Sequence, residues 1–252
     1  TPNWPTSENQ RQWVAEFIER NDLSGGKTAH AFPLKTLARP KGKATRVIIT
    51  EYDMPTAGTV AHDMDIDSKG IVWYTDESDQ LLGRFDPKTA TFTEIREPVL
   101  PAIPKGQLRG TRDVVVDHAD KVWFPIRTPG NETKMSRYDP VTNKLDIVEG
   151  SGGQFVGIGG DGFVWAGATR IDPKTATVEG RYPYQGAPAI PQGAPVGGYH
   201  SHYDSKGNVW VASQSGKGGI ISVDIKTKAV TFKPVPGLRA RRGKIDHKTD
   251  RL

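Results

Sequence analysis

The chain has 252 residues, of which 35% are hydrophobic and 25% charged, with 28 Gly, 19 Pro and no Cys. This turn-rich composition argues against a helical bundle, the absence of Cys excludes disulfides and thiolate metal sites, and the short apolar runs exclude a membrane-spanning helix. The net charge of +5 comes from the two ends of the chain, and the mildly acidic middle, residues 51–232, lacks the basic character of a nucleic-acid-binding protein.

Residues 1–45 are expected to form a helix followed by a linker. Residues 7–10 (SENQ) have the spacing of a capping box, and the apolar residues after them recur on one helix face. Those apolar residues are Trp13, Val14, Phe17 and Ile18. We therefore predict a helix at about residues 8–21, and the Gly and Pro residues after it indicate a linker.

Four of the six Trp residues stand at the end of the same seven-residue motif. The copies are 67–73 (DSKGIVW), 117–123 (DHADKVW), 159–165 (GGDGFVW) and 204–210 (DSKGNVW). A second motif follows each Trp, at 85–89 (FDPKT), 138–142 (YDPVT), 171–175 (IDPKT) and 223–227 (VDIKT). Successive Trp residues are 50, 42 and 45 positions apart, so one structural unit occurs four times.

The chemistry of this unit predicts an all-β protein. The DSKG stretch is typical of a hairpin turn, in which Gly supplies a positive φ, and the residues up to and beyond the Trp are β-branched or aromatic. The Asp-Pro pair of the second motif favours another turn. Three or four short antiparallel strands that recur about every 45 residues are typical of the four-stranded blades of a β-propeller.

The two ends of residues 46–252 suggest that this propeller is incomplete. Residues 46–52 (RVIITEY) are predicted to form an outermost strand with no blade before it. Residues 244–252 resemble a fifth copy of the first hairpin that stops where its Trp is due. We therefore expect four complete blades, parts of another, and a larger ring to which they belong.

The blade motif resembles that of the streptogramin lyase (virginiamycin B lyase) family of β-propellers. The resemblance depends on His62, the alternating strand after it, the DSKG turn, residues 72–76 (VWYTD) and residues 82–89 (LGRFDPKT), and it extends over about residues 46–252. It implies a seven-bladed ring, of which this chain would be a fragment. It also implies opening of a cyclic depsipeptide by elimination across its ester bond, with a His as the proton-transfer group and acidic residues at a Mg²⁺ ion. His62 matches the first role, and Asp76 or Glu77 matches the second.

The start of each innermost strand is expected to face the central channel. The residues that take the place of His62 in the other blades are Arg112, Gln154 and Tyr199, and they are candidate substrate-binding residues together with His200 and His202. His200 and His202 are two positions apart on a strand, so they face the same side. With Asp204 they form a second, weaker candidate metal site.

Two loops are candidates for binding a ligand or a neighbouring domain. Residues 98–110 and 183–198 are long, rich in Pro and Gly, and share the phrase Pro-Ala-Ile-Pro-x-Gly. Loops that a rigid scaffold positions commonly carry binding sites. We expect both loops on one face of the ring.

The sequence leaves two functions open. The first is a lyase in which His62 is the base of a metal-assisted C–O elimination. The second is a non-catalytic propeller that binds a small-molecule or peptide-like ligand at its channel, or holds an adjoining domain, within a larger periplasmic or secreted protein. A gluconolactonase-like hydrolase, also a metal-bearing propeller, is a third and more distant alternative.

Overall fold

The computed structural model describes residues 41–45, 49–182, 198–213 and 219–235, together with Gln12, Glu16, Ile245 and Thr249. The chain divides into two units, residues 1–51 and 52–252. In the first unit, Gln12 and Glu16 have helical backbone, and a short 3-10 helix, η1, covers Gly42–Thr45. The other residues of the helix expected at 8–21 lie outside the described part, so that helix stays a prediction. Across the described residues no helix is long and apolar enough to cross a membrane.

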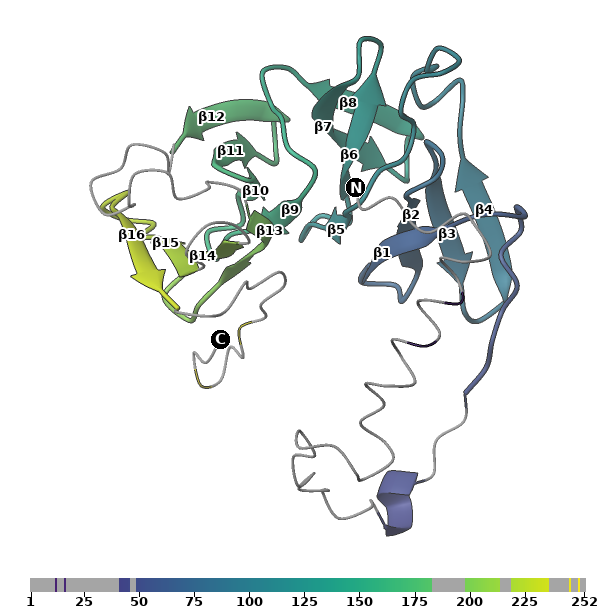
Figure 1. The fold of residues 1–252 in the computed structure, drawn as a ribbon, viewed down its shortest axis with the longest axis horizontal. Coiled ribbons are helices and arrows are strands. Elements are labelled where there is room, and N and C mark those ends of the chain that lie inside the picture. Colours follow the sequence, from purple (N-terminus) through teal and green to yellow (C-terminus); the bar gives the residue numbers. More distant parts are fainter. Residues whose placement is uncertain are drawn as a thin grey trace. The chain divides into compact units, whose positions relative to one another are not determined.

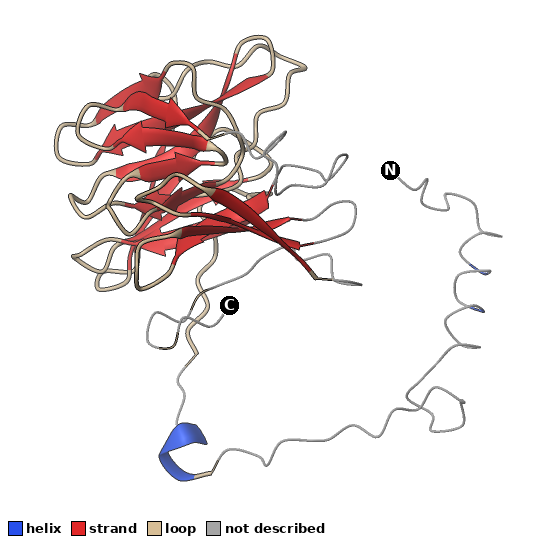
Figure 2. Cartoon of the chain, turned by 90° about the vertical axis from the view of Figure 1, so that its left-hand side faces the viewer, coloured by secondary structure: helices blue, strands red, loops and turns tan. Residues whose placement is uncertain are grey.

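The second unit is built from four antiparallel four-stranded sheets (Figures 1 and 2). Blade 1 contains β1 (Ala61–Ile66), β2 (Val72–Asp76), β3 (Leu82–Asp86) and β4 (Thr91–Ile95). Blade 2 contains β5 (Val115–Val116), β6 (Val122–Thr128), β7 (Glu132–Asp139) and β8 (Lys144–Val148). Blade 3 contains β9 (Val156–Ile158), β10 (Val164–Ala166), β11 (Thr169–Asp172) and β12 (Thr177–Arg181). Blade 4 contains β13 (Gly198–Tyr203), β14 (Val209–Ser213), β15 (Gly219–Val223) and β16 (Val230–Pro234).

The four sheets are the predicted propeller blades. Within each blade the strands pair in sequence order. The first strands of successive blades lie side by side, β1 with β5, β5 with β9 and β9 with β13. Each repeated Trp lies on the second strand of its blade. The prediction that these four Trp residues occupy equivalent places in successive four-stranded blades is therefore confirmed.

The Asp that opens the first hairpin turn holds both the turn and the Trp. In blade 1, Asp67 Oδ1 accepts hydrogen bonds from the backbone N–H groups of Lys69 and Ile71, each at 2.9 Å. The other oxygen of Asp67 accepts the indole N–H of Trp73 at 3.1 Å. Gly70 completes this turn at a φ of 82°, a conformation that an L side chain rarely adopts. One carboxylate thus fixes the turn and orients the largest core side chain.

Blade 3 lacks this carboxylate because Gly159 stands at its position. The indole nitrogen of Trp165 is buried, and no residue in the described part of the chain accepts its hydrogen. The indoles of Trp123 and Trp210 are bound by Asp117 and Asp204 at 2.7 and 2.9 Å. A Cβ atom added to Gly159 would lie 2.8 Å from the indole nitrogen. The indole of blade 3 therefore packs directly against the turn backbone.

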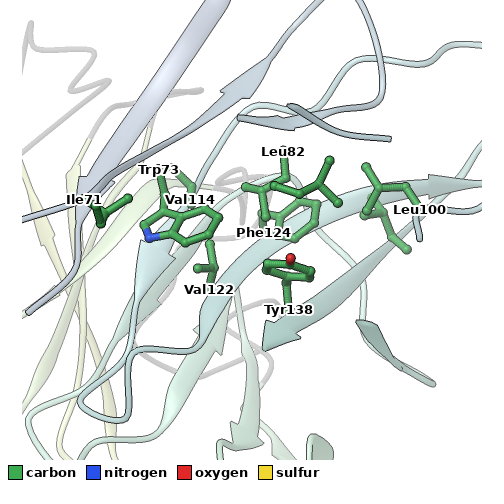
Figure 3. Close-up of a cluster of buried hydrophobic side chains, with 10 residues drawn as sticks. Ile71, Trp73, Leu82, Leu100, Val114, Val122, Phe124 and Tyr138 are labelled. Atoms are coloured by element: carbon green, nitrogen blue, oxygen red, sulfur yellow. The ribbon is translucent and has the colours of Figure 1, made fainter. Parts of the chain in front are cut away.

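The core lies between neighbouring blades, and three of the four repeated Trp residues each belong to one boundary. Trp73 of blade 1 packs with Val122, Phe124 and Tyr138 of blade 2, and Figure 3 shows this cluster. The cluster around Trp123 joins blades 2 and 3 in the same way. The cluster around Trp165 joins blades 3 and 4. Burial of these large aromatic groups is the main apolar contribution that holds adjacent blades together.

Carboxylates on or just before the innermost strands add polar links between the blades. Asp65 Oδ2 accepts the backbone N–H of Val116 at 2.7 Å, which joins blade 1 to blade 2. Asp113 Oδ2 accepts the backbone N–H of Val156 at 2.7 Å, which joins blade 2 to blade 3. These bonds satisfy N–H groups that would otherwise be unpaired at the blade boundary.

The structure describes only part of the two segments expected at the ends of the propeller. The described part of the strand expected at 46–52, residues 49–52, forms no strand. Ile49 is 80% exposed. In the expected partial blade at 244–252, Ile245 and Thr249 are the described residues, and an unfinished blade there stays a prediction.

Candidate functional site

A β-bulge places His62 at the start of the innermost strand of blade 1. The register of β1 on β2 shifts between Ala61 and Met64, so one extra residue is accommodated here, and bulges of this kind redirect side chains. Nδ1 of His62 lies 2.7 Å from the Asp63 carboxylate and 2.6 Å from the backbone carbonyl oxygen of Arg112. Because both neighbours are acceptors, the proton of the neutral imidazole resides on Nδ1, and Nε2 carries the lone pair.

Nε2 of His62 faces an ion pair between Glu77 and Arg112, two other residues that the sequence analysis named as site candidates. It lies 4.0 Å from Oε2 of Glu77, which is beyond hydrogen-bond distance. Oε1 of Glu77 lies 2.7 Å from Nη2 of Arg112. The side chains of Glu77 and Arg112 are 39% and 36% exposed, and that of His62 is 13% exposed. The structure thus brings together three of the residues singled out from the sequence.

Backbone contacts within blade 1 and between blades 1 and 2 fix this arrangement. The N–H of Glu77 donates to the carbonyl oxygen of Val60 at 3.0 Å, and the N–H of Thr111 donates to the carbonyl oxygen of Asp76 at 2.8 Å. Gly110 packs so closely that an added Cβ would lie 1.5 Å from the carbonyl oxygen of Glu77. A side chain at position 110 is incompatible with this approach.

Asp76, the other predicted metal ligand, closes its own loop. It is 1% exposed, and its Oδ1 atom accepts hydrogen bonds from the backbone and hydroxyl of Ser78, both at 2.6 Å. The same oxygen accepts the N–H groups of Asp79 at 3.2 Å and Val60 at 3.3 Å. Four donors on one oxygen give Asp76 a structural role in the turn that presents Glu77.

Both carboxylates expected to bind Mg²⁺ are engaged by groups of the protein in this structure. Glu77 is paired with Arg112, and Asp76 is engaged by its own loop. Within the described ranges no three His, Cys, Asp or Glu side chains are grouped so that they could hold a metal ion. Binding of Mg²⁺ at Glu77 would require Arg112 to move away, and it stays a prediction.

The residues aligned with His62 can be located by counting back from the strand registers. In blade 1, His62 lies three residues before the residue that pairs with the Trp across the first two strands. The same count leads to Arg112 in blade 2 and to Gln154 in blade 3, just before β5 and β9. Both line one small cavity. Tyr199 takes the same register position in blade 4, but its side chain and that of His200 lie outside the described part. The prediction that these residues bind substrate is therefore not tested.

The carboxylate of the second candidate metal site, that of Asp204, is hydrogen-bonded to its own turn and to Trp210. Oδ1 of Asp204 accepts the N–H groups of Lys206 and Asn208 at 3.0 and 2.9 Å, and Oδ2 accepts side-chain N–H groups of Asn208 and Trp210 at 3.0 and 2.9 Å. Burial would raise the pKa of Asp204, but these hydrogen bonds lower it below its ordinary value. Asp204 holds its turn and its Trp, as Asp67 does in blade 1. His202 is partly buried on β13, where it pairs in register with Trp210.

Arg127 is a site residue that the sequence analysis missed. It follows Trp123 by four positions, as Glu77 follows Trp73, so the alignment of the repeats could have found it. It lines the cavity beside Arg112 and Gln154. Burial, followed by the neighbouring charge of Arg112, lowers the pKa of Arg127 below its ordinary value. In the described part of the chain, no carboxylate forms an ion pair with Arg127.

The loop of residues 98–110 leads into this site. Leu100 and Ile103 of the loop are buried, and the carbonyl oxygen of Pro101 accepts the side-chain amide of Gln80 at 2.7 Å. The loop is thereby anchored on blade 1 before it reaches Gly110 and Arg112. Of the second loop, residues 183–197 lie outside the described part, so a common binding face for both loops stays a prediction.

These features define an all-β propeller that carries a cluster of imidazole, carboxylate and guanidinium groups where the first strands of blades 1 and 2 begin. No protein-family model and no curated protein matches the sequence. The fold does match solved structures, and all of the matches described below are under 25% identical, so they establish the fold alone.

Two of the similar structures are lyases. A streptogramin B lyase structure matches with a TM-score of 0.58 and 16% identity, over 78% of this chain and 61% of that chain. A catalytically inactive virginiamycin B lyase from Staphylococcus aureus, with quinupristin, matches with a TM-score of 0.60 and 15% identity, over 80% of this chain and 64% of that chain. This chain therefore spans less than two thirds of the length of either lyase.

A third similar structure is not described as an enzyme. It is the extracellular domain of a one-component system from B. thetaiotaomicron, with a TM-score of 0.51 and 19% identity. The match covers 71% of this chain and 26% of that chain. The same blade architecture thus occurs in lyases and in an extracellular domain, so the fold does not by itself select a function.

Proposed function

We propose that this propeller binds a cyclic, ester-containing peptide at the start of its innermost strands and opens the ring by elimination. The observation that carries this proposal is the environment of His62. Its Nδ1 atom donates to the carbonyl oxygen of Arg112 at 2.6 Å, which leaves the lone pair of Nε2 available as a general base. The fold similarity to two streptogramin-type lyases supports the same chemistry.

The reaction is a β-elimination in which His62 moves a proton. Nε2 of His62 takes the proton from the carbon next to a substrate carbonyl group, and the electrons of that C–H bond form a C=C double bond. The C–O bond of the ester breaks on the neighbouring carbon, and its electrons leave with the carboxylate. Arg112 is suited to bind that carboxylate, because its guanidinium fork can donate to both oxygens. Glu77 holds Arg112 close to His62 before the substrate binds.

The test compares His62→Ala with His118→Ala. His118 is an exposed residue in the first hairpin turn of blade 2, away from the candidate site, so its loss controls for removal of an imidazole. The substrate is quinupristin, incubated with and without Mg²⁺ and followed by mass spectrometry. Elimination leaves the mass of the product unchanged, whereas hydrolysis adds one water. Loss of ring opening in His62→Ala alone supports the proposal, and unchanged turnover in that variant contradicts it.

The second candidate function is a non-catalytic binding module. The Glu77–Arg112 ion pair favours a binding function, because Arg112 is bound to the carboxylate that would hold Mg²⁺ in the lyase. The likeness to an extracellular domain supports it as well. If the wild-type chain binds quinupristin or another peptide-like ligand but produces no ring-opened product under any metal condition, the binding function replaces the lyase function.

A further inference from the structure

A small cavity lies beside the candidate site. It lies between the last residues before β5 and the end of β6, and its volume of about 10 Å³ admits one water-sized group. Its lining includes Thr111, Arg112, Arg127 and Gln154. Because Arg112 also contacts His62 and Glu77, the cavity adjoins the proposed base.

The charge around this cavity is not balanced. Arg112 is paired with Glu77. Arg127 donates from Nε to the carbonyl oxygen of Gly110 at 3.3 Å and from Nη1 to the hydroxyl of Thr133 at 2.8 Å. Both of these partners are neutral, and the described residues supply no carboxylate to Arg127. A partly buried guanidinium without a counter-charge favours an anion in the space next to it.

Thr111 provides an independent indication of a bound group. The residue is 4% exposed, and its buried hydroxyl has no hydrogen-bond partner among the described residues. Leaving such a group unsatisfied destabilises the folded protein. Thr111 lines the same cavity as Arg127, so an oxygen atom placed there could accept from the hydroxyl and from the guanidinium together.

We propose that this cavity is part of a carboxylate-binding pocket, in which one oxygen of a ligand carboxylate enters the cavity. The residues that would bind the carboxylate are Arg127, Thr111, Arg112 and Gln154. The choice of a carboxylate rests on the proposed function, because elimination across the ester sets a carboxylate free beside Arg112. Arg127 is then a specificity-determining residue for ligands that carry or release this group. An equivalent Arg is absent from blades 1 and 3, where Glu77 and Thr169 stand at the same distance from the Trp.

Acetate is the probe for this pocket, because it carries a carboxylate but no ester that could undergo elimination. Isothermal titration calorimetry at constant ionic strength measures acetate binding to the wild-type chain, to Arg127→Gln and to Thr111→Val. Arg84→Gln, which removes a partly exposed Arg on β3, is the matched control. We expect about a tenfold or larger loss of acetate affinity in Arg127→Gln, a smaller loss in Thr111→Val and no change in Arg84→Gln.

The Thr111→Val variant separates binding from folding. It keeps the shape of the side chain and removes an unpartnered hydroxyl, so its stability in urea should equal or exceed that of the wild type while its acetate affinity falls. No acetate binding to the wild type, equal binding in all variants, or binding of chloride without acetate would each overturn the proposal. If acetate binds as expected while quinupristin is not opened, the pocket stands and the elimination fails.

Discussion

Nη2 of Arg112 and Oε1 of Glu77 lie 2.7 Å apart, and they belong to different blades. Glu77 directly follows β2 of blade 1, and Arg112 lies shortly before β5 of blade 2. With more than a third of each side chain exposed, such a pair contributes only about 0–1 kcal/mol to stability. The main consequence of the ion pair is therefore to position two charged groups beside His62.

Metal affinity should depend on this ion pair. Replacement Arg112→Gln frees the carboxylate of Glu77, and Mg²⁺ prefers carboxylate ligands. We expect tighter Mg²⁺ binding in Arg112→Gln than in the wild type, measured by isothermal titration calorimetry. Lys134→Gln, which frees the exposed Glu149 on blade 2, is the control and should leave Mg²⁺ affinity unchanged. Equal affinity in Arg112→Gln and the wild type would contradict Mg²⁺ binding at Glu77.

The Trp residues should differ in what their replacement costs. Trp123 and Trp165 are both fully buried, but only the indole of Trp123 is bound by a carboxylate, that of Asp117 at 2.7 Å. Trp123→Phe removes packing and leaves Oδ2 of Asp117 without its indole donor, whereas Trp165→Phe removes packing and an N–H that no described residue accepts. We expect Trp123→Phe to lower the free energy of unfolding by about 1–2 kcal/mol more than Trp165→Phe. Urea denaturation measures both, and equal losses would refute the role of Asp117.

Gly110 should tolerate no side chain. In Gly110→Ala the added Cβ would meet the backbone of Glu77 at 1.5 Å, so the two segments must separate. We expect a loss of about 3 kcal/mol or more in the free energy of unfolding, together with loss of any ligand binding at His62. Gly152→Ala is the control, because its Cβ would lie 3.9 Å from the nearest atom, the carbonyl oxygen of Thr133. Similar unfolding curves for the two variants would disprove the close approach.

Acid should weaken the Asp204 turn. Burial alone would raise the pKa of Asp204, but hydrogen bonds from Trp210 and Asn208 hold it below its ordinary value in the folded chain. A lowered folded-state pKa gives stability that is complete above the unfolded value of about 4 and is lost as the pH falls through the folded value. Asp204→Asn should therefore be less stable than the wild type at pH 7, and the difference should shrink below about pH 4. Denaturation series across this range test the prediction, which fails if the two curves stay parallel.

The sequence by itself determined the blades. The first hairpin turn, the Trp six residues after its Asp, and the second turn all act over a few residues, so their chemistry is the same in any context. Gly70, Gly162 and Gly207 each take the positive φ that the hairpin requires, and Asp120 takes it in blade 2. The same locality explains why the repeat alone was sufficient to align His62, Arg112 and Gln154 as equivalent positions.

Which of the candidate side chains contact one another depends on the tertiary structure. Asp76 and Glu77 are neighbours in the sequence, yet one carboxylate binds its own loop and the other reaches Arg112 of the next blade. Arg127 belongs to the site only because blade 2 places it beside Arg112. These outcomes depend on packing between blades, on the close approach of Gly110 to Glu77 and on the bulge at His62. Such contacts join segments that are far apart in the chain, and no local pattern of residues encodes their geometry, because it follows from how whole sheets pack against each other.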